Sequence, residues 1–271
     1  MYARARLNVV GWDADLEIER YAEAPQPAAD QVVVRVHACG VAQRDVIDRS
    51  GRVAFMQVPI TPGHEAAGVV EAVGAGVTQW QVGDHVATMH RDSCGTCPVC
   101  VAGETSLCET AFWVFGLMVD GGYASHLVCP ERALYRLPTT MPLAHGAILL
   151  SAWGTAWRGL HKFGRLQAGA RVLVTGANGG VGSAAVQLAR KLGAHVVAVV
   201  RDERHVPFVE SMGAERVIVA DGRFDTGAWK ADVVLECVGA ATFTSALRSL
   251  RLGGGLVAIG NIDDKKVSLS I

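Results

Sequence analysis

Hydrophobic and polar positions follow two different patterns along the chain, with a change near residue 146. Before it, apolar and β-branched runs such as "QVVVRVHACG" and "GDHVATMH" are interrupted by glycine and proline, and helical periodicity is scarce. We therefore predict a mostly-β, largely antiparallel, barrel-like domain over residues 1–146. After it, buried strands alternate with amphipathic helices, which predicts a doubly wound parallel sheet over residues 147–271.

The second region predicts a sheet of five strands. They are expected at residues 171–175, 195–200, 216–220, 232–236 and 255–260. Helices are expected in "VGSAAVQLARKLG", in "ERHVPFVESMG" with Pro207 in its first turn, and in "ATFTSALRSLRLG". A complete dinucleotide-binding sheet of this kind has about six strands. The last residues, "KKVSLSI", alternate like one more strand, so we expect a sheet that is incomplete at its C-terminal end or covered there by a partner.

A glycine-rich turn lies between the first of these strands and the helix that follows it. The stretch "VLVTGANGGVGSAAVQLARKLGA" places glycines where a backbone must turn sharply and approach a pyrophosphate, whose charge the N–H groups of the helix start then bind. The alternative is an ordinary strand–helix turn. We predict a dinucleotide site, with its cofactor-binding residues at Gly176, Gly179, Gly180, Val181 and Gly182.

The end of the second strand bears on which dinucleotide binds. An NAD site commonly has Asp or Glu there, about 20 residues after the glycines, to hold the ribose hydroxyls. Here the position is Val200, and Arg201 and Arg204 follow, whose guanidinium groups suit a 2′-phosphate. We therefore expect NADP rather than NAD, although Asp202 is a contrary feature and the arginines could belong to a solvated helix start.

Composition and charge argue against a nucleic-acid-binding, membrane or secreted protein. Half of the 271 residues are hydrophobic, 19% are charged and the formal net charge is −1, which gives no footprint for a nucleic acid or a membrane surface. No apolar run approaches the ~20 residues of a membrane helix, and the N-terminus has no signal-peptide core. We expect a cytoplasmic protein.

Four of the seven cysteines fall within "CGTCPVCVAGETSLC". Polar residues and turn formers surround them, which argues against four reduced core cysteines, and four thiolates close a tetrahedral zinc shell with no open position. We predict one structural zinc in a lobe at about residues 90–110. Its metal ligands are Cys94, Cys97, Cys100 and Cys108.

These features, taken in order, resemble the medium-chain dehydrogenases/reductases, the zinc-type alcohol dehydrogenase superfamily. The matching stretches are "ACGVAQRD", "GHEAAGVVEAVGAGV", "VGDHV", the cysteine lobe, "GGYASHLV", "GTAWRGL", "TGANGGVG", and "ECVG" with "GGGLVAIG". The resemblance implies an α/β protein with a GroES-like mostly-β barrel domain, a Rossmann domain and hydride transfer at a nicotinamide. It is strongest to acryloyl-CoA reductase-like and quinone oxidoreductase-like members. It also implies a further C-terminal segment, a small-molecule substrate and a homo-oligomer.

The catalytic zinc ligands of the family are only partly present. The first ligand, a cysteine, is replaced by Ala42, and the third by Ser151, while the second is retained as His64. Cys39 lies three residues before the first ligand position, so it is not the ligand by position. A catalytic zinc needs about three protein ligands. We therefore expect no catalytic zinc, although His64 with Glu65 could hold a weak, exchangeable metal.

Arg44, Asp45 and His64 are the candidate catalytic residues. Arg44 could stabilise charge on a substrate oxygen, or form a structural ion pair with Asp45 or contact a phosphate. Asp45 is expected to orient His64, which could relay a proton or be merely structural. The resemblance implies that Thr155 touches the nicotinamide, the alternative being helix capping or packing.

Three hypotheses follow. The first is an NADPH-dependent reductase of an activated alkene or carbonyl that works without catalytic zinc. The second is a zinc-dependent alcohol dehydrogenase with a substitute ligand such as Cys39 or Asp45. The third is a truncated, non-catalytic homologue that binds a nucleotide or a partner subunit.

Overall fold

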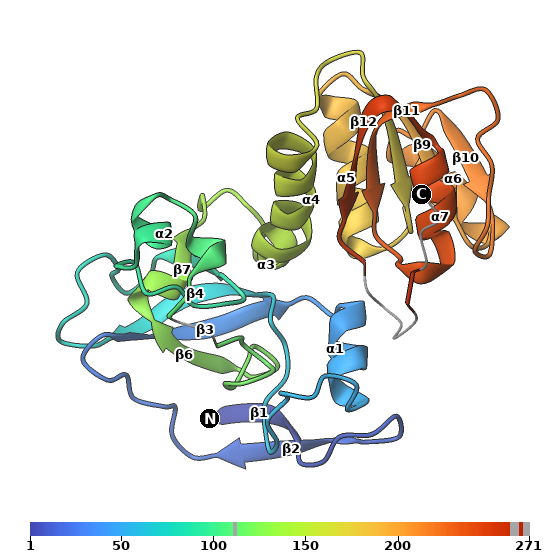
Figure 1. The fold of residues 1–271 in the computed structure, drawn as a ribbon. Helices are drawn as coiled ribbons and strands as arrows, with labels where there is room; N and C mark the ends of the chain where they lie inside the picture. The colour runs from blue at the N-terminus through green and yellow to red at the C-terminus, as the bar shows by residue number, and fades with distance from the viewer. Residues whose placement is uncertain (111–112, 261–265, 268–271) are drawn as a thin grey trace. The chain divides into compact units, whose positions relative to one another are not determined.

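A computed structural model describes residues 1–110, 113–260 and 266–267. The chain divides into two compact units, Met1–Ser151 and Ala152–Ile271, each with its own sheet (Figure 1). The residues at which the polar pattern changes are thus close to the point where the chain passes from one unit to the next.

The first unit is built on an antiparallel sheet with the order β6-β3-β4-β5-β7, and β1 and β2 form a separate antiparallel pair. This confirms the predicted mostly antiparallel β domain, whose five-stranded sheet has β6 and β7 as its edges. The strands are β1 (Tyr2–Leu7), β2 (Leu16–Tyr21), β3 (Gln31–Cys39), β4 (Ala66–Val73), β5 (His85–Thr88), β6 (His126–Pro130) and β7 (Leu134–Arg136). Its helices are α1 (Gln43–Arg49), α2 (Pro98–Val101) and α3 (Leu143–Ile148), with 3₁₀ turns η1 (Thr105–Leu107) and η2 (Glu131–Ala133).

The second unit holds a parallel sheet with the order β10-β9-β8-β11-β12, so the first strand in the chain lies in the middle. This is the dinucleotide-binding order without a sixth strand among the described residues. The strands are β8 (Arg171–Thr175), β9 (His195–Val200), β10 (Arg216–Val219), β11 (Ala231–Glu236) and β12 (Leu250–Ala258). The helices are α4 (Gly154–Arg158), α5 (Gly180–Lys191), α6 (Val206–Ser211) and α7 (Ala240–Arg248), with the π-helical turn η4 (Gly159–Phe163) and the 3₁₀ turn η5 (Glu203–His205). The π-helical turn η3 (Leu149–Trp153) crosses from the first unit into the second.

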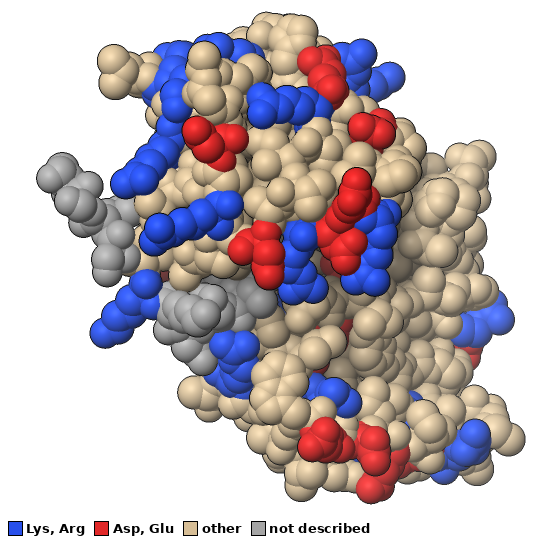
Figure 2. Space-filling view, turned by 90° about the vertical axis from the view of Figure 1, so that its right-hand side faces the viewer, with Lys and Arg blue, Asp and Glu red and all other residues tan. Residues whose placement is uncertain are grey.

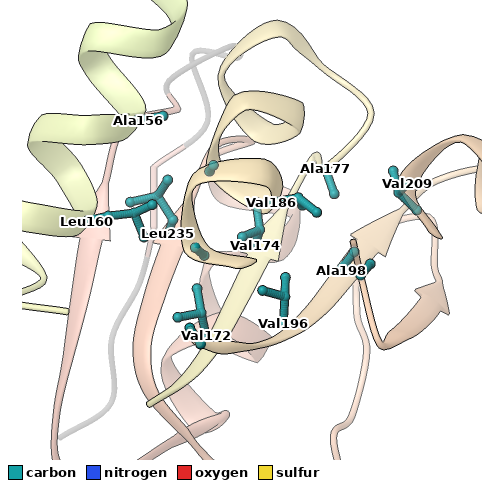
Figure 3. Close-up of a cluster of buried hydrophobic side chains, with 14 of the residues drawn as sticks. Ala156, Leu160, Val172, Val174, Ala177, Val186, Val196, Ala198, Val209 and Leu235 are labelled. Carbon is teal, nitrogen blue, oxygen red and sulfur yellow. The ribbon is translucent and has the colours of Figure 1, made fainter. Parts of the chain in front are cut away.

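Both faces of this sheet are buried, which explains why its strands are apolar at successive positions. Alternate side chains such as Val172, Val174 and Leu235 pack with α5 on one face (Figure 3). The residues between them, such as Leu173 and Val234, pack with α7 on the other face. Burying a side chain of this size stabilises the folded state by about 1.5–3 kcal/mol. The central strands are therefore well fixed, and so are the turns that follow their carboxyl ends.

The last helix and strand differ from the prediction. The helix expected to run to Gly253 ends at Arg248, and β12 begins at Leu250 instead of residue 255. Leu250 pairs with Ala231, and Gly253 then takes a positive φ of 74°, so the glycines form an irregular strand start and not a helix end. The further strand predicted at residues 265–271 lies mostly outside the described residues.

The surface carries mixed charge. Lys and Arg side chains lie among Asp and Glu side chains on the face drawn in Figure 2, and the two signs nearly balance over the sequence, with a formal net charge of −1. None of the helices that the structure describes is long and apolar enough to span a membrane.

Candidate functional site

The four lobe cysteines converge in the first unit. Cys97 caps the short helix α2, Cys100 lies within it, and η1 then brings Cys108 back to Cys94. Their sulfur atoms all lie within 4.8 Å of one another, and all seven cysteines of the chain carry free thiols. Four convergent thiols without a disulfide are the donor set of a closed tetrahedral zinc site.

Backbone N–H groups point at these sulfurs. The N–H groups of Thr96 and Cys97 donate to Cys94 Sγ at 3.4 and 3.2 Å, and the Cys94 N–H donates to Cys108 Sγ at 3.3 Å. A hydrogen bond from Thr110, followed by the backbone N–H of Cys97, lowers the pKa of Cys94 to about 5, whereas burial and the neighbouring thiols raise the pKa of Cys100 to about 12. Because such donors stabilise thiolate, the form that ligates a metal, the lobe fits zinc on its geometry.

The glycine-rich turn has the shape that a pyrophosphate site requires. Gly176 follows β8 with φ of 57°, and Gly179 caps α5, which begins at Gly180. A Cβ on Gly182 would lie 2.2 Å from the Gly176 carbonyl oxygen, so only glycine lets the helix approach the turn so closely. Val181 is half-buried in the first turn of α5. The turn therefore fits a dinucleotide, with the first N–H groups of α5 as anion donors.

The end of β9 presents an arginine and an internal ion pair. Val200 is buried and Arg201 is exposed. Asp202 accepts the Arg204 N–H at 3.0 Å and pairs with Arg204 Nε at 3.0 Å. The Asp202 carboxylate thus caps η5, and the structure places Arg204 against it.

Asp45 and His64 form a buried pair in the first unit. Asp45 Oδ1 lies 3.2 Å from His64 Nδ1, and Asp45 Oδ2 accepts the Ala42 N–H at 2.7 Å, which fixes the carboxylate at the start of α1. Burial raises the pKa of Asp45, but the hydrogen bonds from His64, Ala42 and Tyr123 outweigh it and lower the pKa below its usual value. His64 Nε2 makes no hydrogen bond within the described part of the chain, so it is the nitrogen left for chemistry.

Arg44 has a different partner from the one considered above. Its Nε donates to Asp48 Oδ2 at 3.1 Å, four residues on in α1, and not to Asp45. The reason is helical spacing, since side chains at i and i+4 share a face while i and i+1 do not. Asp48 is buried, and that burial raises its pKa despite Arg44.

The other groups considered as metal ligands do not form a convergent ligand set among the described residues. Cys39 is at the end of β3, where burial raises its pKa to about 12, far from the thiolate range. Glu65 is 5% exposed, and its Oε2 lies 2.2 Å from where a Cβ on Gly40 would be, so it packs on that backbone. Among the residues that the structure describes, only the four lobe cysteines form a convergent group of three or more metal-binding side chains.

Two side chains beside His64 were not predicted. The His90 ring lies edge-on to the His64 ring, with centroids 6.3 Å apart, and burial followed by the charges of His64 and Arg44 lowers its pKa to about 4. Tyr123 hydrogen-bonds with Asp45, and burial followed by the Asp45 charge raises its pKa. Tyr123 lies in the matching stretch "GGYASHLV", but the sequence assigned no role to it or to His90, because neither lies near His64 along the chain.

Thr155 lies in the second unit, on α4. With Arg158, Gly159 and Phe163 it lines a cavity of about 450 Å³, whose other wall is the end of β12 at Leu256–Ile259. On α4 as well, Trp157 is 44% exposed and stacks on His161 at a ring distance of 4.9 Å. Thr155 is thus a cavity-lining residue and not the cap of a helix.

Comparisons with known proteins agree with this fold. Residues 28–139 match the Alcohol dehydrogenase GroES-like domain family, and residues 180–271 match the Zinc-binding dehydrogenase family. An acryloyl-coenzyme A reductase from Metallosphaera sedula is 35% identical over 246 residues, which are 90% of this chain and 73% of the relative.

Solved structures give the same result. The structure of AibC has a TM-score of 0.89 at 39% identity, over 99% of this chain and 77% of that one. A cobalt- and zinc-bound alcohol dehydrogenase from Pyrobaculum aerophilum has a TM-score of 0.88 at 34% identity, over 100% and 80%. The chain therefore belongs to the zinc-type alcohol dehydrogenase superfamily, the medium-chain dehydrogenases/reductases. It is an NAD(P)-dependent oxidoreductase, and it spans about three quarters of the length of these relatives.

Proposed function

We propose that the protein is an NADPH-dependent reductase of an activated alkene or carbonyl that works without a catalytic zinc and carries one structural zinc. The observation that carries this proposal is the loss of ligands at Ala42 and Ser151, together with the absence, in the described ranges, of any convergent ligand group besides the cysteine lobe. A catalytic zinc needs about three protein ligands, and only His64 remains at the three family positions. The similarity to an acryloyl-coenzyme A reductase supports a conjugated C=C as substrate.

In this proposal the lobe cysteines hold zinc, which supplies structural cross-linking only. The turn from Gly176 to Gly182 and the start of α5 hold the dinucleotide, and bound NADPH supplies a hydride for the β-carbon of the substrate. Negative charge then develops on the conjugated carbonyl oxygen and requires a donor or a cation nearby. His64 and Arg44 are the groups of the first unit assigned to that charge.

His64 is assigned as the proton donor. Its Nδ1 lies 3.2 Å from Asp45 Oδ1, which fixes the ring and directs Nε2 away from the carboxylate. Arg44 is assigned as an electrostatic group. Asp48 engages its Nε, and among the described residues its two terminal nitrogens have no hydrogen-bond partner, so they can bind an oxygen of the substrate.

The Arg44 assignment is tested by separating charge from structure. R44A leaves the buried Asp48 carboxylate without its cation and is expected to cost about 1–3 kcal/mol of stability. The double variant R44A/D48A removes both partners and restores most of that stability. A lowered kcat in both variants supports the electrostatic role, whereas recovery of kcat in the double variant assigns Arg44 to structure alone.

The reaction class is tested by steady-state assay. NADPH oxidation is followed with an α,β-unsaturated thioester, a quinone and an aldehyde, and NADP⁺ reduction with primary alcohols, each with and without a chelator. Reduction of the alkene or quinone that resists the chelator is expected. Alcohol oxidation abolished by the chelator would support the zinc-dependent alternative, for which the zinc-bound alcohol dehydrogenase of similar fold is the precedent.

The preference for NADP rests on Val200 and on the exposed Arg201 after β9. Fluorescence titration with NADPH and NADH measures it directly. We expect NADPH to bind more tightly than NADH. We expect R201A to raise the Kd of NADPH about tenfold and to leave the Kd of NADH unchanged. R216A is the matched control, since Arg216 is also exposed but begins its strand at the opposite end of the sheet. Equal or tighter binding of NADH would contradict the preference.

A further inference from the structure

Glu236 is a fully buried acidic side chain that the proposed reaction does not use. It ends β11 with 0% exposure, and none of the ion pairs among the described residues includes it. A buried carboxylate without a cation is costly unless donors surround it. Its surroundings therefore require an explanation.

Four donors satisfy this carboxyl. Oε1 accepts hydrogen bonds from the Thr175 hydroxyl at 2.8 Å, from the Val238 N–H at 3.2 Å and from the Thr242 hydroxyl, and Oε2 accepts the Gly239 N–H at 2.8 Å. The Thr175 oxygen itself accepts the Cys237 N–H at 2.9 Å, so its proton is directed at Glu236. The group acts only as an acceptor, which is the role of a carboxylate and not of an amide.

The same residue ties three strand ends together. Its side chain links the end of β8, through Thr175, to the start of α7, and its backbone carbonyl accepts the N–H groups of Ile259 and Gly260 at 2.8 and 3.0 Å, just after β12. The carboxyl ends of β8, β11 and β12 are therefore joined at one residue. Carboxyl ends of parallel strands form the crevice in which open α/β sheets bind ligands.

The turn that follows Glu236 lies against the glycine-rich turn. Thr175 directly precedes Gly176, and a Cβ on Gly176 would approach Val238 Cγ2 to 3.0 Å. On the other side, a Cβ on Gly260 would come within 2.2 Å of the Cys237 carbonyl carbon. The segment 237–239 is thus enclosed between two glycines, and a small displacement of it would change the crevice at the ends of β11 and β12.

The order of the strands shows which half of a dinucleotide this segment serves. In the order β10-β9-β8-β11-β12, the adenosine half of the cofactor belongs to β8 and β9, and the second mononucleotide half belongs to β11 and β12. We propose that Glu236 is a positioning residue for the nicotinamide half of the cofactor, because its carboxylate fixes the segment 237–239 on which that half rests. This proposal rests on the proposed binding of a nicotinamide dinucleotide.

The test compares two ligands on the isosteric variant E236Q. The glutamine amide turns an NH₂ group toward donors, so the segment must shift while the glycine-rich turn keeps its own backbone. NADPH spans both halves of the site, whereas 2′,5′-ADP occupies the adenosine half alone. We expect the Kd of NADPH to rise about tenfold or more and the Kd of 2′,5′-ADP to stay within about twofold of the wild type.

The control is E215Q, since Glu215 is an exposed partner of Arg190 and His195. It should leave both dissociation constants unchanged. Should E236Q fail to fold, T175V removes one donor and should give a smaller shift in the same direction. An equal rise in the Kd of both ligands, or no rise in either, would overturn the positioning role and assign Glu236 to stability alone.

Failure of the underlying function gives a different result. A wild-type protein that binds neither NADPH nor NADH overturns the dinucleotide site itself, and the inference with it. Where NADH binds more tightly than NADPH, the same comparison is made with NADH and ADP. In that case the split between whole cofactor and adenosine half still decides the role of Glu236.

Discussion

Gly182 gives the sharpest steric test of the dinucleotide site. In G182A the added Cβ would lie 2.2 Å from the Gly176 carbonyl oxygen and 2.8 Å from Ala177 Cα, whereas ordinary contacts begin near 3.4 Å. Both neighbours are backbone atoms, so no side chain can rotate away and α5 must move by about 1 Å relative to the turn. Overpacking of this kind costs about 1–3 kcal/mol, against which alanine gains back about 1 kcal/mol of helix propensity.

The expected result is therefore a modest loss of stability and a large loss of binding. The melting temperature should fall by a few degrees, since 1 kcal/mol shifts it by about 2–4 °C in a chain of this size. A displacement of about 1 Å at the phosphate turn should raise the Kd of NADPH by about 10–100-fold in a fluorescence titration. G255A is the matched control, since a Cβ there meets nothing within 4 Å and the residue has no positive φ. NADPH binding by G182A within about twofold of the wild type would refute the assignment of this turn to the cofactor.

Two more predictions concern carboxylates. D45N removes the charge that holds the buried His64 ring. The kcat should fall about tenfold or more, at an unchanged Kd for NADPH. An unchanged kcat would show that His64 takes no part in the reaction. Asp232 has a pKa that the hydrogen bond from Arg251 lowers, so its stabilisation is complete above the unfolded pKa of about 3.9 and is lost as pH falls through the lower folded pKa. In urea unfolding, D232N should thus be less stable than the wild type at pH 5–7, with the difference disappearing toward pH 2–3; a difference that grows on acidification would contradict this sign.

The sheet of the second unit was predictable because its chemistry is local. Buried strands such as Arg171–Thr175 are apolar at successive positions, and α5 has helical spacing and a glycine after its end. The boundary between α7 and β12 could not be predicted from local sequence. Leu250 pairs in the sheet with Ala231, which lies nineteen residues earlier, and so it belongs to the strand. Tertiary pairing overrode helix propensity there.

The candidate site divides in the same way. The lobe cysteines and the glycine-rich turn follow from spacing, since each motif closes within a short loop. The partner of Arg44 follows from helix geometry once α1 is known, but the sequence alone left it open. The bond between Thr175 and Glu236 joins residues that are 61 positions apart, and no local pattern carries that information.

The zinc content of the pure protein tests the central claim most directly. Metal analysis after exhaustive dialysis should give one zinc per chain, and C97S, which breaks the four-cysteine lobe, should lower it toward zero. NADPH-dependent reduction by the wild type should continue when loosely bound metal is removed. Two zinc ions per chain, with activity lost as the second is chelated, would contradict a reaction without catalytic zinc.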